Sequence, residues 1–345
     1  MRSLSLIEPL TSYFTDRNKE LKIFSNFQSK SLLNLTRDFF LNLLFEKVKD
    51  PYRPEDFTKY VREKAQINIK EEQDPFIFLD NLMKYVNKRL NRFDSDIDYH
   101  FNDILNNING EELHNDLEKI FNKNNSIIGK LFLGIILETY KCDKCDKKIE
   151  QMNPFNILDI DYKGIINELQ NKNNSIVGFE IDNLLEFYFL RKKIENMKKP
   201  IIDCPNCGNK LIILERKIIS YPEYLIIRLN RGAFNQKDGF EEKESFSLFS
   251  INYENIENLE NYSSEKNING NINSKKYTLI NMVNSYKDEK KNDVRFLSIC
   301  TIPNAPNLKI WIKFKCNEPA QNLKDGYKED NESEYYILFY RLQNK

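Results

Sequence analysis

Two short stretches decide the fold of this chain: KCDKC at residues 141–145 and DCPNCG at residues 203–208. Each holds two cysteines separated by two residues, a spacing that places both thiolates on one side of a tight turn. Two such turns supply four sulfurs, the ligand set of a tetrahedral zinc site with bonds of about 2.3 Å. Because four protein ligands leave no open position for water, the expected zinc is structural. We predict one Zn2+ ion held by four cysteines: Cys142, Cys145, Cys204 and Cys207.

Two other interpretations of the cysteine pairs are open from the residues alone. The pairs could be unrelated and bind nothing, or one of them could be redox-active. A redox motif needs only one pair and usually lies at the start of a helix after a strand, so two pairs favour zinc. Residues 146–203 lie between the pairs, so a shared metal ion would join two hairpins that are distant in sequence.

The composition indicates a folded globular protein and disfavours several functional classes. Hydrophobic residues make up 40% of the 345 residues, with 24 Phe and 18 Tyr, far more bulky apolar side chain than disordered chains carry. Lys+Arg and Asp+Glu each total 52, so no net charge favours nucleic acid or an anionic membrane. We find no apolar run of roughly 20 residues and no signal-peptide core. We therefore expect an intracellular protein, in the nucleus or cytoplasm, without direct nucleic-acid or membrane contact.

The hydrophobic pattern changes along the chain from a helical to a β-type period. Residues 32–48, 54–65 and 74–93 show apolar residues near a 3.6-residue period, and residues 101–126 read as a helix pair or an insertion. After residue 127 short β-type runs follow, separated by polar loops, the longest at 235–275. Helices first and strands second predict an α+β fold with an antiparallel sheet.

Several segments, in order, resemble the ubiquitin-specific protease family. DPFIFL at 74–79 is similar to the family's QQDAxEFL helix, although Ile77 replaces its usual glutamate. LFLGIILETYKCDKC at 131–145 resembles the strand that enters the zinc-binding region, and PEYLIIRLNR at 222–231 is similar to a proline-led PxxLxIxLxRF strand. YTLINMVN at 277–284 and YILFY at 336–340 resemble the last palm strands.

The resemblance implies a papain-like cysteine-protease hand, in which a thumb, palm and fingers grip ubiquitin. The expected single domain, 1–345, divides into a helical thumb at 1–126, zinc-ribbon fingers with the start of the palm at 127–230, and an antiparallel β palm at 231–345. The implied partner is ubiquitin or a ubiquitin-like protein.

The same resemblance places unsuitable residues where catalysis needs a cysteine, a histidine and an orienting acid or amide. LSLIEPLTSYF at 4–14 is similar to the helix that follows the family's cysteine box, so we expect the nucleophile to be missing. VRFLSIC at 294–300 is similar to GHYxAYC, which puts Arg295 at the histidine position, and a guanidinium cannot act as a base. WIKFKC at 311–316 places Lys315 and Cys316 where Asn or Asp is usual.

No other residue is predicted to be catalytic. His100 and His114 are the only histidines and lie in the polar helical region, where we expect surface positions. Cys300 and Cys316 lack a nearby base, and a free cysteine in a strand is usually a small buried apolar group. Asp74 and Tyr277 are expected to be a helix cap and a core aromatic.

Three functions are compatible with these residues. The preferred one is a non-hydrolysing scaffold that binds ubiquitin, a ubiquitin-like protein or a complex such as the spliceosome, where the family has an inactive tri-snRNP assembly factor. That branch generally lacks the cysteine pairs. The second is an amino-terminally truncated deubiquitinase that cleaves isopeptide bonds, against which Arg295 argues. The third is a zinc-ribbon nucleic-acid module, which the balanced charge disfavours.

Overall fold

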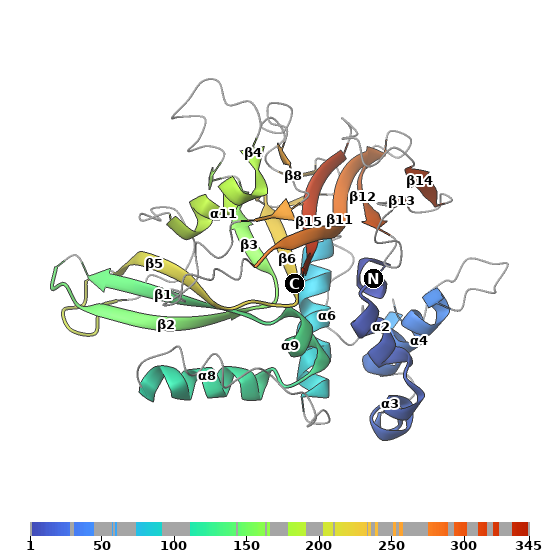
Figure 1. Cartoon of the computed structure of the whole chain (residues 1–345), viewed down its shortest axis with the longest axis horizontal. Helices are drawn as coiled ribbons and strands as arrows, with labels where there is room; N and C mark the ends of the chain where they lie inside the picture. Colours follow the sequence, from blue (N-terminus) through green and yellow to red (C-terminus); the bar gives the residue numbers. More distant parts are fainter. Residues whose placement is uncertain are drawn as a thin grey trace.

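The structure of the chain is a computed structural model (Figure 1). The described residues are 2–27, 31–44, 57, 59–60, 74–91, 111–142, 144–162, 164–165, 179–190, 203–209, 211–232, 234–235, 239–240, 251–252, 255–257, 275–288, 293–301, 310–315, 320–323 and 333–343.

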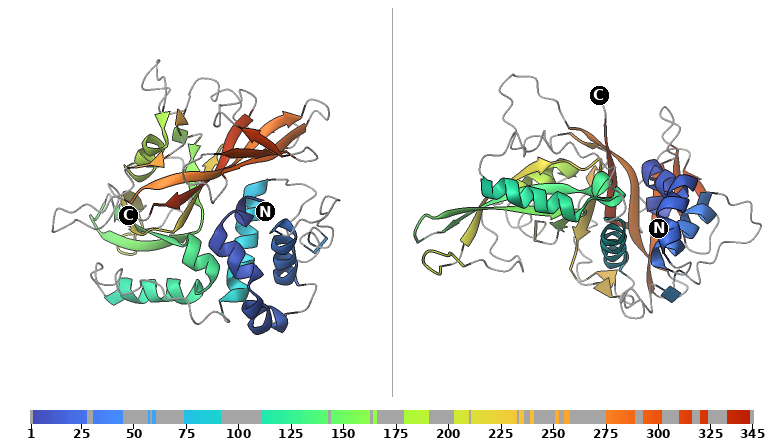
Figure 2. Two further views of the ribbon diagram at one scale, coloured as in Figure 1. Left: turned by 45° about the vertical axis from the view of Figure 1, so that its right-hand side comes forward. Right: turned by 90° about the horizontal axis from the view of Figure 1, so that it is seen from below.

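Helices form the thumb, a name we use for the helical layer on one face of the main sheet (Figures 1 and 2). Its helices are α1 (Arg2–Ser5), α2 (Glu8–Thr15), α3 (Arg17–Lys22), α4 (Leu32–Leu44), α6 (Pro75–Leu90) and α9 (Ile127–Phe132), with a short 3-10 turn at Phe24–Asn26. The central helix, α6, begins after a capping residue: the Asp74 side chain accepts a hydrogen bond from the Phe76 N–H. Pro75 takes the first helical position.

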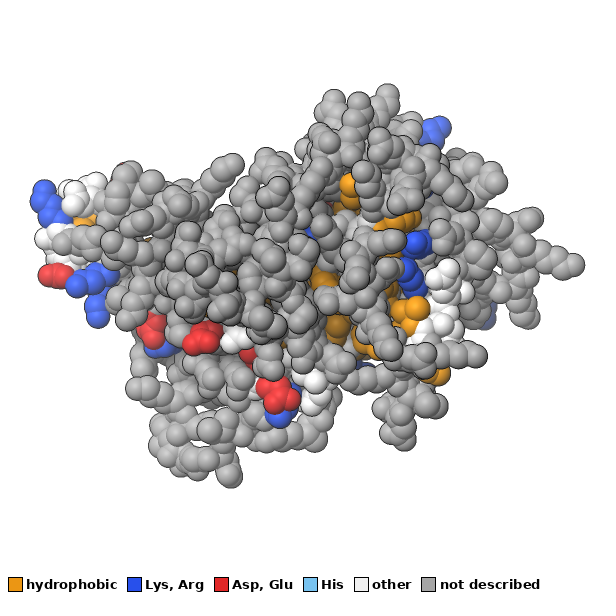
Figure 3. All heavy atoms as spheres, turned by 90° about the horizontal axis from the view of Figure 1, so that it is seen from above, with side chains coloured by type: hydrophobic (Ala, Val, Ile, Leu, Met, Phe, Trp, Pro, Cys, Tyr) orange, Lys and Arg blue, Asp and Glu red, His pale blue; other side chains and the backbone are white. Residues whose placement is uncertain are grey.

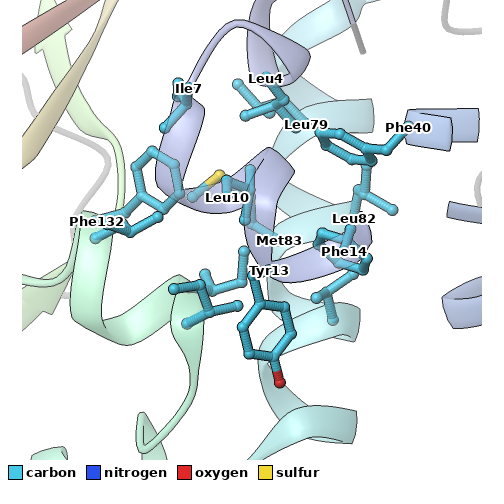
Figure 4. Close-up of a cluster of buried hydrophobic side chains, with 14 of the residues drawn as sticks. Leu4, Ile7, Leu10, Tyr13, Phe14, Phe40, Leu79, Leu82, Met83 and Phe132 are labelled. Carbon is cyan, nitrogen blue, oxygen red and sulfur yellow. The ribbon is translucent and has the colours of Figure 1, made fainter. Parts of the chain in front are cut away.

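Apolar side chains from five of these helices make one core (Figure 4). Phe14 of α2 stacks on Phe40 of α4 with ring centroids 5.0 Å apart, and Leu10 and Met83 lie between α2 and α6. Palm strands also contribute to this cluster, among them Ile337 and Phe339. The thumb and palm therefore share a hydrophobic core, and this core seats α1 against the sheet.

The palm is an eight-stranded sheet with the strand order β14-β13-β12-β11-β15-β6-β3, and β10 pairs with β11 at the side. Its strands are β3 (Leu158–Asp161), β6 (Tyr224–Asn230), β10 (Asn255–Ile256), β11 (Tyr277–Asp288), β12 (Asp293–Thr301), β13 (Trp311–Phe314), β14 (Gln321–Leu323) and β15 (Ser333–Leu342). Every palm pair is antiparallel except β3 with β6, which is parallel and departs from the purely antiparallel sheet expected. Four further short strands form two separate pairs outside the palm, β4 with β9 and β7 with β8. Their bounds are β4 (Phe179–Glu180), β7 (Phe234–Asn235), β8 (Gly239–Phe240) and β9 (Ile251–Asn252).

The fingers are the separate three-stranded sheet β2-β1-β5. Strand β1 (Gly134–Cys142) lies between β2 (Lys148–Phe155) and β5 (Leu211–Ser220), and both pairs are antiparallel. Helix α8 (Glu111–Lys123) runs along one face of this sheet (Figures 1 and 2) and packs on Ile135 and Met152. Helix α11 (Ile181–Leu190) packs with β5 and with Ile136 on the other face.

Three other expectations from the sequence also differ from the structure. Residues 127–132 form α9 instead of a strand, because Ser126 caps the helix by accepting from the Gly129 N–H. Strand β2 was not predicted from its largely polar sequence. The expected loop at 235–275 contains three short pairing segments at 239–240, 251–252 and 255–256. The expected helix at 54–65 and residues 101–110 lie mostly outside the described residues.

Among the described helices, none is both long enough and apolar enough to cross a membrane.

Candidate functional site

The four predicted cysteines meet at the far end of the fingers. Their sulfur atoms all lie within 4.8 Å of one another. The Sγ atoms of Cys142 and Cys207 are 3.4 Å apart, and those of Cys145 and Cys204 are 3.6 Å apart. A tetrahedron with metal–sulfur bonds of about 2.3 Å has edges of about 3.8 Å, so these separations are those of a four-sulfur site. The cluster could hold a metal ion.

The two cysteine turns have the same backbone hydrogen bonds. Cys142 N–H donates to the Lys147 carbonyl (2.9 Å), and Asp146 N–H donates to the Cys142 carbonyl (3.1 Å). The second turn repeats both bonds at the same spacing, from Cys204 to Asn209 (2.6 Å) and from Gly208 to Cys204 (2.8 Å). The residue four positions after the first cysteine has a positive φ in each turn, 53° at Asp146 and 71° at Gly208. The sequence therefore builds two equivalent half-sites.

Hydrogen bonds to the sulfurs affect their ionisation. A side-chain hydrogen bond from Asn206, followed by a backbone bond from Lys147, lowers the pKa of Cys145 to about 6. The pKa of Cys207 is instead raised to about 12: the Asn209 backbone bond, its largest single influence, lowers it, but burial and the hydrogen bonds with the other three thiols outweigh that bond. The opposite directions arise because one thiolate in a close group keeps its neighbours protonated. A bound cation would favour thiolate at all four positions.

A buried ion pair supports the base of the fingers. Arg216 of β5 donates from Nε to the Glu138 carboxylate of β1 at 2.8 Å, and its Nη1 donates to the Tyr188 carbonyl of α11 at 2.9 Å. The other Glu138 oxygen accepts from the Tyr140 hydroxyl (2.5 Å) and from Asn153 Nδ2 (2.6 Å). Burial raises the pKa of Tyr188 to about 12, so its hydroxyl stays neutral. The network joins the three strands of the fingers and α11 to one another.

Helix α1 meets the palm on one face of β12. Ser3 Oγ and Ser298 Oγ are 3.0 Å apart, and Ser298 Oγ is 3.1 Å from the Cys300 sulfur. Ser298 also donates to Asn281 Oδ1 of β11 at 3.3 Å. Since strand residues alternate between faces, Phe296 shares this face, and it packs against the thumb core. The face that meets α1 thus carries hydroxyl, thiol, amide and aromatic groups.

Arg295 lies on the opposite face of β12 from α1. It is paired with Tyr286 of β11, and directly paired residues share a face. Tyr286 packs against the other palm core, as do Leu297 and Ile299, which follow Arg295 at two-residue intervals. Lys315 Nζ lies 4.7 Å from the centre of the Tyr286 ring. Two cationic side chains therefore flank Tyr286, while Cys316 is outside the described residues.

A family model described as ubiquitin carboxyl-terminal hydrolase matches residues 1–340. The chain belongs to this family. The suspected resemblance is confirmed, and so is the predicted class of fold, a helical thumb with an antiparallel palm and cysteine-bearing fingers. No curated protein matches the chain in sequence.

Solved structures of SAGA DUB modules share the fold of this family member. A module of a Ubp8 variant with Sgf11, Sus1 and Sgf73 gives a TM-score of 0.61 at 16% identity, covering 99% of this chain and 66% of the other. A yeast SAGA DUB module with an Sgf73 mutant gives 0.61 at 14% identity, covering 99% and 65%. The Ubp8/Sgf11/Sus1/Sgf73 module bound to ubiquitin aldehyde gives 0.59 at 15% identity, covering 99% and 66%. This chain spans about two thirds of the length of those chains.

The other residues considered in the sequence analysis of this ubiquitin carboxyl-terminal hydrolase family member are a helix cap, buried core residues and a partly exposed histidine. Asp74 caps α6 and is buried, and Tyr277 is fully buried and donates its hydroxyl to the Pro222 carbonyl (2.5 Å), as expected for a cap and a core aromatic. His114 lies on α8 and is partly exposed, whereas His100 is outside the described residues. Cys300 is buried, as expected for a strand cysteine.

The polar contacts around α1 and inside the fingers could not be predicted from the sequence. Ser3 and Ser298 come from opposite ends of the chain, and the Glu138–Arg216 pair joins strands 78 residues apart. A charged residue inside an apolar strand pattern, such as Arg216 in LIILERKIIS, is the one signal that could have indicated a buried partner.

Proposed function

We propose that this chain is a non-hydrolysing member of the ubiquitin carboxyl-terminal hydrolase family, which binds ubiquitin or a ubiquitin-like protein as a scaffold. Its fingers carry one structural zinc ion, bound by Cys142, Cys145, Cys204 and Cys207. The family membership supplies the ubiquitin pathway, and the residues of the chain itself supply the argument against hydrolysis.

The observation that carries the proposal is the face of β12 that meets α1. A base serving a nucleophile at the amino end of α1 would have to stand on this face. Phe296 and Ser298 occupy it, and neither side chain can accept a proton near neutral pH. Arg295 lies on the other face, and it too stays protonated.

The sequence of the palm strands agrees with this proposal. Residues 211–345 contain no histidine, and the position after β13 where an orienting acid or amide is usual in the family holds Lys315. A cation there would oppose an imidazolium instead of stabilising it. We infer that the general-base role is not filled by the palm.

Zinc is the metal that suits the cysteine cluster best. Four thiolates at tetrahedral spacing favour Zn2+ over oxygen-seeking ions such as Mg2+ or Ca2+. The ion would close the distant ends of two hairpins, β1–β2 and the turn before β5, and so stabilise the fingers. All four coordination positions are filled by protein, which assigns it a structural role.

The partner proposed is ubiquitin, within a larger protein assembly. A chain with this fold is bound to ubiquitin aldehyde in one solved module and to other subunits in all three. A place in the spliceosome, or in another nuclear or cytoplasmic complex, is part of the proposal and rests on the earlier family resemblance.

A turnover assay with a binding titration tests the proposal. Ubiquitin joined through its carboxyl terminus to a fluorogenic amine should release no fluorophore with this chain, while free ubiquitin should bind it saturably. The matched control is the same assay with Phe296→His, which places an imidazole on the face that meets α1. Cleavage by the unaltered chain would establish the alternative, a cysteine-type deubiquitinase, and absence of ubiquitin binding would overturn the scaffold role.

A further inference from the structure

The end of the fingers concentrates lysines around the cysteine cluster. Residues 141–148 and 203–210 together contain five lysines and three aspartates, within a chain whose overall charge is zero. Lys144, Lys147 and Lys148 are exposed, and among the described residues of these two turns the ion pair is that of Lys141 with Asp146, at 2.7 Å. Figure 3 shows Lys or Arg side chains gathered at this end of the molecule.

Two of these lysines face each other in an arrangement that normally destabilises a sheet. Lys141 of β1 and Lys148 of β2 are directly paired across the hairpin. Like charges directly opposite each other on neighbouring strands repel, so the pair requires a compensating negative charge nearby. Asp146 neutralises one lysine of the hairpin and leaves the others unbalanced among the described residues.

A cysteine cluster with its proposed zinc ion would itself supply the missing negative charge. A divalent ion with four thiolates carries two net negative charges, and the sequence around it carries two net positive charges. We propose that Lys144, Lys147 and Lys148 form a charge-compensating shell that raises the affinity of the fingers for zinc. This inference rests on the proposed zinc site.

The backbone positions these lysines close to the sulfurs. Lys144 lies between the two cysteines of the first turn, and the Lys147 carbonyl accepts the Cys142 N–H while its own N–H bonds to the Cys145 sulfur. The turn therefore holds the backbone of Lys144 and Lys147 next to the thiolates, within reach of their side chains. Exposed charges act at this range with an energy that salt reduces, which gives the shell a measurable signature.

Zinc affinity, measured by competition with a chromophoric chelator at low and high salt, tests the proposal. The triple variant Lys144→Gln, Lys147→Gln, Lys148→Gln should bind zinc about fivefold more weakly at low salt, and the difference should shrink at high salt. The charge-retaining triple Lys→Arg variant at the same positions should keep the unaltered affinity. A control triple on helices of the thumb, Lys22→Gln, Lys84→Gln, Lys88→Gln, should have no effect.

The possible outcomes separate this inference from the zinc site itself. Metal content of the unaltered chain is measured first, and a chain that takes up no zinc would overturn both. Zinc uptake with equal affinity in the Gln and unaltered chains would overturn only the lysine shell. Equal zinc affinity together with loss of binding to an acidic peptide, or to RNA, would assign the lysines to a partner instead.

Discussion

The Tyr336 hydroxyl donates to both oxygens of the Asp74 carboxylate, at 2.7 and 2.8 Å, across 262 residues of sequence. Tyr336 reaches the thumb because of a β-bulge: Val283 pairs with Ile337 and Asn284 with Tyr335, so the register between β11 and β15 shifts at Tyr336. Arg228 of β6 completes the contact by donating from Nε to the Tyr336 oxygen at 3.1 Å. The amino end of α6 is thereby joined to two palm strands.

Removing the Tyr336 hydroxyl should loosen this contact. In Tyr336→Phe the buried Asp74 carboxylate loses a hydrogen-bond donor, and a hydrogen bond to a charged group contributes about 1.5–3 kcal/mol. Arg228, whose Nη2 lies 3.7 Å from Asp74, would compensate in part. Urea unfolding followed by circular dichroism measures the loss.

A double-mutant cycle with Asp74→Ala separates the bond from the side chains. If the hydroxyl and carboxylate interact as described, the double variant should be less destabilised than the two single losses added together. Additive losses would show that the two residues act independently.

The Glu138–Arg216 pair should be costly to break on one side. Both side chains are almost fully buried, so Glu138→Ala leaves an unpaired guanidinium inside the fingers, at a cost of about 3–5 kcal/mol. The apolar replacement of both, Glu138→Leu with Arg216→Met, should recover much of the stability. Thermal unfolding compares the three chains, and a double variant as unstable as Glu138→Ala would contradict the explanation.

The cysteine cluster was predictable from sequence because the CxxC spacing alone fixes two half-sites. The helices α4 and α6 were predictable because each has an apolar face with helical period. Strand β2 was not, since it is an edge strand in which only Met152 is buried, so KIEQMNPF has no alternating apolar pattern. The apolar run IIGKLF is compatible with a strand or a helix, and the hydrogen bond from the Gly129 N–H to the Ser126 side chain stabilises the helix.

Long-range polar contacts could not be predicted from the sequence for a different reason. The Tyr336–Asp74 contact depends on a bulge, and which face of β12 meets α1 depends on strand register. A shift of one residue exchanges the faces of a strand. The motif match placed Arg295 at the histidine position, and only the register reveals that Phe296 lies on the side of α1.

Gly134 should not tolerate a side chain. A Cβ atom there would clash with the ring of Phe155, its cross-strand partner on β2. Gly134→Ala must displace this ring and should destabilise the fingers by about 1–3 kcal/mol, the usual range for overpacking. Thermal unfolding measures it, and Gly134→Ala combined with Phe155→Leu should restore part of the loss; no recovery would contradict the clash.

Substitution of the residue four positions after the first cysteine should destabilise one cysteine turn and stabilise the other. Gly208 has a φ of 71° with open space around it, so Gly208→Ala should destabilise the zinc-loaded fingers through the backbone alone, by roughly 1–2 kcal/mol. Asp146 has the same type of φ but carries a side chain, so Asp146→Gly should relieve strain and slow zinc release to a chelator. The control Asp146→Asn keeps a residue that tolerates this φ and removes the Lys141 ion pair. Faster zinc release from Asp146→Gly than from Asp146→Asn would show that the backbone at this turn is not strained.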